Sequence, residues 1–126
     1  IGSSVVNSGT IETSANNSIG IRVGGGSVTN AGAIRSVLTG PAIALIPIAG
    51  VSVVGASAAF TNASAGSVMA SHIGVRIGGV EATSLSNSGI IEAVPAIQSD
   101  GTWAINGGAV VVTGSAVAQI SNSGAI

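Results

Sequence analysis

The sequence predicts an all-β protein: a β-solenoid of parallel strands, with about four to five coils of 23–35 residues each. Two observations predict this fold. A short motif centred on Asn recurs five times along the 126 residues, and apolar residues alternate with small or polar ones around it. The composition fits as well, because 20 Gly, 6% charged and 2% aromatic residues suit narrow coils packed with small and β-branched side chains.

The recurring motif is Asn-Ser-Gly or a close variant, placed between two apolar residues. Its copies are centred on Asn7, Asn30, Asn62, Asn87 and Asn122, at spacings of 23, 32, 25 and 35 residues. Gly adopts positive φ without strain and Asn tolerates the left-handed region, so the motif predicts a tight turn between two strands. The copy at Asn62 carries two extra residues in its turn.

A second motif follows the turn and has the strict alternation of a strand. Its copies are Ile19–Gly25, Ile73–Gly79 and, more weakly, Trp103–Gly108, and the region Ile43–Gly50 takes the same place in the second repeat. This alignment puts Trp103 level with Ile21 and Val75, at a core position. If Trp103 points outward instead, it is a candidate partner contact.

Stacked coils predict columns of equivalent residues. One buried column comprises Val5, Val28, Phe60, Leu85 and Ile120. A second comprises Ile11, Ile34, Val68, Ile91 and Ile126. A structural Asn ladder, with amides bonded between coils, comprises Asn7, Asn30, Asn62, Asn87 and Asn122. The alternative for each Asn is a role confined to its own turn.

The charged residues are few. Glu12 and Arg35 fall on adjacent strands and predict a cross-strand ion pair, whereas Arg22 and Arg76 should lie exposed on one face, two coils apart. A net charge of −1 with three Arg and no Lys excludes a nucleic-acid partner. The absence of Cys and the single His exclude structural zinc and a disulfide framework.

No residue set predicts a reaction. Glu12 and Glu92 fall three coils apart, about 14 Å on the strand spacing and beyond the reach of a glycosidase pair. Glu81 and Asp100 are isolated, and His72 is expected at the surface or in a loop. We therefore expect no catalytic residues, no cofactor and no metal, and no enzymatic activity. The uncharged stretch Pro41–Phe60 has the length of a membrane span, but its Pro and Gly residues oppose one.

The motifs resemble the passenger repeats of Gram-negative autotransporters and related large surface adhesins. The resemblance covers nearly the whole chain, through Asn7–Ile11, Asn30–Ile34, Asn87–Ile91 and Asn122–Ile126. It implies a right-handed parallel β-helix that is secreted to the cell surface at the Gram-negative outer membrane. There such passengers mediate adhesion, aggregation or biofilm formation.

The chain is expected to be one segment, residues 1–126, of a longer repetitive protein. The expected partners are flanking coils of the same chain or an end-to-end homo-oligomer, together with host or bacterial surface receptors. Two alternatives stay open: a polysaccharide-degrading β-helix enzyme and a phage tail-fibre segment. An ice-binding face is disfavoured because Thr10, Thr29, Thr39, Thr61 and Thr83 are assigned to different phases of the repeat.

Overall fold

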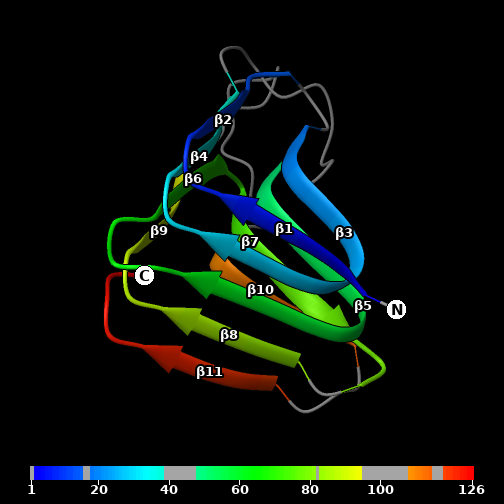
Figure 1. Cartoon of the computed structure of the whole chain (residues 1–126). Coiled ribbons are helices and arrows are strands. Elements are labelled where there is room, and N and C mark those ends of the chain that lie inside the picture. Colours follow the sequence, from blue (N-terminus) through cyan, green and yellow to red (C-terminus); the bar gives the residue numbers. More distant parts are fainter. Residues whose placement is uncertain (1, 16–17, 39–47, 82, 95–107, 115–117) are drawn as a thin grey trace.

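The computed structural model describes residues 2–15, 18–38, 48–81, 83–94, 108–114 and 118–126. Within them the chain forms strands and no helix, and every pair of neighbouring strands is parallel (Figure 1). The strands are β1 (Ser3–Asn7), β2 (Thr10–Thr13), β3 (Ile19–Asn30), β4 (Ala33–Ser36), β5 (Ala49–Asn62), β6 (Ser67–Ser71), β7 (Ile73–Gly79), β8 (Thr83–Asn87), β9 (Ile90–Val94), β10 (Gly108–Gly114) and β11 (Ala118–Asn122). The expected all-β, parallel class is confirmed.

The strands form three parallel stacks. The first stack contains β1, the second halves of β3 and β5, then β8 and β11. The second stack contains β2, β4, β6 and β9. The third contains the first halves of β3 and β5, then β7 and β10. Along the sequence the chain visits first, second and third stack in the same order in each repeat, or layer.

The two apolar columns lie in the expected register. In the first stack Val5, Val28, Phe60, Leu85 and Ile120 are paired in succession. In the second stack Ile11, Ile34, Val68 and Ile91 are paired in succession. These columns meet the alternating Val and Ile of the third stack in one hydrophobic core, so the layers are held together by burial as well as by strand pairing.

The expectation that both columns are buried throughout is wrong at both ends: Val5 and Ile11 are only partly buried, and the last layer is more exposed still. Phe60 is 1% exposed, but Ile120 is 51% exposed and Ile126 is 54% exposed. The last layer has a neighbour on one side only within the described residues, because β11 pairs with β8 alone. A residue at an inward position therefore stays accessible when no further layer covers it.

The unequal spacing of the Asn motifs arises mainly at one place in the layer. The chain passes from the second to the third stack through residues 14–18, 37–48, His72 alone, and 95–107 in the four successive repeats. The longest connections occur in the repeats of 32 and 35 residues. These differences in length leave the pairing of the described strands on either side unchanged.

The expected alignment of the second motif is wrong in two repeats. Ala49, rather than a residue near Ile43, pairs with Ile19, so the equivalent strand begins six residues later. In the last repeat Val110 pairs with Val75, the place expected for Trp103, which lies outside the described residues. The expected alignment follows the Gly-Gly pair that ends each copy of the motif. In the structure the β-branched run Val110–Val112, which favours a strand, pairs with β7 instead.

The role expected for Gly in the Asn-Ser-Gly turn is also wrong. Gly89 does not adopt positive φ; the described glycines that do are Gly25, Gly26, Gly55 and Gly114. These four lie near the bend from the third to the first stack. At Gly89 the constraint is space, because a Cβ would collide with the carbonyl oxygen of Gly66 in the adjacent layer.

The stretch considered as a membrane span is strand in its described part apart from Ile48. Residues 49–60 belong to β5, at the centre of the first and third stacks. Among the described residues no helix has the length and apolar character needed to cross a membrane.

Candidate functional site

The five asparagines form a continuous ladder at the ends of the first-stack strands. Each Nδ2 donates to the Oδ1 of the next Asn, and all four of these bonds measure 2.8 Å. The three inner asparagines are buried, and each also donates to backbone carbonyl oxygens of its own turn and of the next layer. The structure thus brings together all five residues of the expected ladder, inside the turn that joins the first and second stacks.

The ladder is open at its two ends, and the open groups are complementary. At one end the Nδ2 of Asn122 donates only to Gly124 O among the described residues. At the other end, within the described part of the chain, the Oδ1 of Asn7 accepts only the Gly9 amide hydrogen. In the inner layers, an Asn of the adjacent layer forms the corresponding bond: one neighbour donates to the Oδ1, and the other accepts from the Nδ2.

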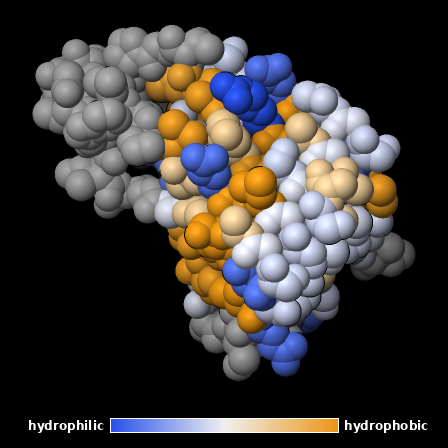
Figure 2. Space-filling model, turned by 90° about the vertical axis from the view of Figure 1, so that its left-hand side faces the viewer, coloured by the Kyte–Doolittle hydropathy of each residue, from blue (hydrophilic) through white to orange (hydrophobic). Residues whose placement is uncertain are grey.

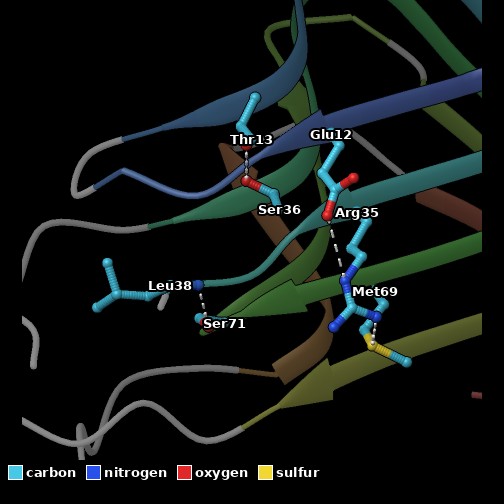
Figure 3. A network of polar contacts seen from close by, with 7 residues as sticks. All are labelled: Glu12, Thr13, Arg35, Ser36, Leu38, Met69 and Ser71. Atoms are coloured by element: carbon cyan, nitrogen blue, oxygen red, sulfur yellow. Dashed lines mark hydrogen bonds and ion pairs between the residues drawn. The ribbon is translucent and has the colours of Figure 1, made fainter. Parts of the chain in front are cut away.

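The outer face of the second stack carries a short row of charges. Glu12, Arg35, Met69 and Glu92 occupy equivalent positions on successive strands. Figure 3 shows Glu12 and Arg35 facing each other, with Arg35 Nε 3.7 Å from Glu12 Oε1 and its Nη1 3.5 Å from the Met69 sulfur. Both charged side chains are more than half exposed, so the pair contributes at most about 1 kcal/mol.

Small hydroxyl groups bridge the layers at the end of the second stack. Thr13 Oγ1 and Ser36 Oγ lie 2.6 Å apart, and Ser71 Oγ accepts the backbone N–H of Leu38 at 3.0 Å (Figure 3). These bonds satisfy buried polar groups near the connections to the third stack. Their role is therefore structural.

The outer face of the first stack carries hydroxyl groups and no charge. One row along it comprises Ser4, Ser27, Ala59, Ser84 and Gln119. The other comprises Val6, Thr29, Thr61, Ser86 and Ser121. Thr29 and Thr61 are therefore in phase, and the expectation that they are not is wrong. In Figure 2 this side, toward the right, is mostly of intermediate hydropathy, whereas apolar side chains gather nearer the centre of the view.

The outer face of the third stack carries the other two arginines. Arg22, Ser52 and Arg76 occupy equivalent positions on three successive strands. They line one depression of about 340 Å³ together with Ile19, Val23, Gly24, Ala49 and Val54. Ser52 is buried between the two arginines, and Arg76 is only half-buried, although its Nε is enclosed. This is the one described face on which two like charges share a concave site.

His72 lies in a connection between strands, which is one of the two places expected for it, but it is not at the surface. It is the single residue between β6 and β7, with φ of 82° and 5% exposure. Its backbone N–H donates to Val94 O and its C=O accepts from Gly108 N–H, so both backbone groups are engaged by the next layer. The one-residue connection forces the side chain under the neighbouring segments, which sequence spacing alone does not reveal.

The described carboxylates are dispersed. Glu12 and Glu92 lie three strands apart on the second stack, and Glu81 accepts a 2.9 Å hydrogen bond from Ser57 Oγ near the end of β7. Among the described residues no group of three His, Asp or Glu side chains could hold a metal ion. Asp100 and Trp103 lie outside the described residues.

Comparisons with protein-family models, curated proteins and solved structures found no match to this chain.

Proposed function

We propose that the chain is a stretch of right-handed parallel β-helix from a secreted cell-surface protein of a Gram-negative bacterium. Its role is structural and adhesive: it builds a stiff rod and contributes to adhesion, aggregation or filament formation. The regular visit to three parallel stacks, layer after layer, supports the β-helix. The resemblance of the Asn-Ser-Gly repeats to passenger repeats supports the location at the surface.

One observation supports the structural role most strongly: the Asn ladder is continuous from Asn7 to Asn122 through successive layers. Strands β1 and β11 each have one partner within the described residues. An unpaired strand edge offers backbone N–H and C=O groups to another strand. We propose that these edges can pair with a second copy stacked end to end.

The proposal includes no enzymatic activity. A retaining or inverting glycosidase needs two carboxyl groups within about 5–9.5 Å. Glu12 and Glu92 are separated by two intervening strands, or about 14 Å on the usual spacing. Arg35 and Met69 occupy the positions between them, so this row supports strand pairing rather than acid–base chemistry.

Display at a bacterial surface tests the proposal. The 126-residue chain is fused to an outer-membrane translocator in a non-adherent Gram-negative host. We expect the chain to become accessible to antibody on intact cells and to increase sedimentation of the culture or attachment to host cells. A matched strain carries the same fusion with Phe60→Asp, which places a charge in the core and should prevent folding.

The two strains distinguish the outcomes. Adhesion that depends on the folded chain supports the proposal. A chain that reaches the surface in folded, protease-resistant form yet leaves aggregation and attachment at the level of the host would contradict the adhesive role.

A further inference from the structure

The depression on the third stack is suited to an oxyanion. Arg22 and Arg76 lie two strands apart, so their Cα atoms are separated by about 10 Å on the usual strand spacing. Both line the same concavity, with the Ser52 hydroxyl between them. A guanidinium group presents a planar fork of N–H donors that fits a carboxylate or a sulfate.

The two arginines are not neutralised by neighbours in the described structure. The one ion pair among the described residues joins Glu12 and Arg35, on the second stack. Glu92 lies on that same stack and Glu81 is bonded to Ser57 near the end of β7. The described outer surface of the third stack therefore carries positive charge only, contributed by Arg22 and Arg76.

Arg76 has donor capacity to spare. Its Nε is enclosed and has no hydrogen-bond partner among the described residues. A buried donor without a partner is unfavourable by about 1–3 kcal/mol. Arg76 as a whole is only half-buried and lines the depression, so the guanidinium group is held beside the concavity. Arg35 differs, because Glu12 already faces its Nε.

We infer that this depression binds the carboxylate or sulfate group of an acidic polysaccharide, with Arg22 and Arg76 on either side of the anion and Ser52 donating or accepting a hydrogen bond. Its volume of about 340 Å³ is at the small end of the range for small-molecule sites, which suits one charged sugar unit. The apolar side chains of Ile19 and Val54 offer contact to the C–H face of the sugar ring. The placement of this ligand at a cell surface rests on the proposed function.

Binding in solution tests the inference without cells. Calorimetric titrations of the 126-residue chain use dextran sulfate, polygalacturonate, neutral dextran and poly-glutamate. We expect binding of at least one acidic polysaccharide, weakened by salt, and a loss of about tenfold or more in affinity for the variant Arg22→Gln/Arg76→Gln. Arg35→Gln removes one positive charge from another face and is the matched control for the single variant Arg22→Gln.

The arms of the experiment separate the outcomes. Binding of dextran sulfate alone assigns a sulfate site, and binding of polygalacturonate alone assigns a carboxylate site; both support the inference. The inference is overturned by failure of both to bind, by equal binding of neutral dextran or poly-glutamate, or by an equal loss in Arg35→Gln. Arg22 is exposed, so Arg22→Gln alone keeps the test decisive if replacement of Arg76 prevents folding. Adhesion by displayed cells is scored separately, so the two proposals fail independently.

Discussion

A few polar residues determine how the layers align. Asn62 is 1% exposed and takes part in side-chain bonds to the layers on both sides, accepting from Asn30 and donating to Asn87. It also donates to the carbonyl oxygens of Gly66 and Ile90. Because each inner amide satisfies groups in three layers, a shift of register by one residue would leave several buried donors and acceptors without partners.

The ladder gives a prediction at this scale. Asn62→Ala should lower the free energy of unfolding by roughly 3 kcal/mol, because Asn30 Nδ2 and Asn87 Oδ1 each lose a buried partner. Asn122→Ala is the control at the exposed end, where a loss below about 1 kcal/mol is expected. Denaturant unfolding of both variants measures the difference; equal losses would show that the ladder contributes nothing beyond local turn formation.

Turns and strands differed in how far the sequence predicted them. The Asn motifs fixed the register of the first and second stacks, since each copy marks the same turn and the apolar neighbours follow it. The third stack was aligned wrongly in two repeats. The connections before it, residues 14–18, 37–48, His72 and 95–107, differ in length, so counting from the Asn motif does not locate the next strand.

The candidate sites were predicted unevenly for the same reason. The Asn ladder and the Glu12–Arg35 pair follow directly from equivalent positions in the turn motif. The sequence placed Arg22 and Arg76 on one face, but it did not identify Ser52 between them, because β5 had been aligned near Ile43. The burial of His72 was missed because it depends on a one-residue connection.

The Asn-Ser-Gly turn gives a prediction at the scale of an element. Gly9 and Gly89 hold the same turn position, but a Cβ at Gly89 would collide with the adjacent layer, whereas one at Gly9 meets nothing within 4 Å. Gly89→Ala should therefore destabilise the protein by about 1–3 kcal/mol, and Gly9→Ala should have little effect. Thermal unfolding compares the two; a similar change in Tm for both would refute close stacking of the turns.

At the scale of the whole molecule, the composition explains how closely the stacks can pack. Small side chains allow the stacks to approach closely: a Cβ at Gly50 would lie 2.5 Å from Val68 Cγ1 on the second stack. Few charges are needed when most strand edges are covered by further layers. The charged side chains of the described residues lie on the second and third stacks or near the end of β7. The first-stack outer face is left uncharged.

The open ends give a prediction at this scale. We expect the chain at high concentration to associate end to end, and Asn122→Lys to suppress this because it places an ammonium group where the next Asn amide would lie. Ser121→Lys adds the same charge to the outer face of the same strand and should leave association intact. Sedimentation velocity distinguishes them. A parent chain that stays monomeric at high concentration would contradict end-to-end association.

The ladder, the arginine depression and the open ends all depend on one claim, the parallel in-register stacking of layers. The chain contains no Cys, so a pair of introduced cysteines reports on this stacking without background from native thiols.

Thr29 and Thr61 are paired on adjacent strands, about 4.8 Å apart, within the Cα separation that a disulfide spans. Thr29→Cys/Thr61→Cys should therefore form an intramolecular disulfide in dilute solution, seen as loss of two free thiols. Val6→Cys/Thr61→Cys, two layers apart at about 10 Å, should not form one. Efficient cross-linking of the second pair, or none of the first, would contradict the stacked register.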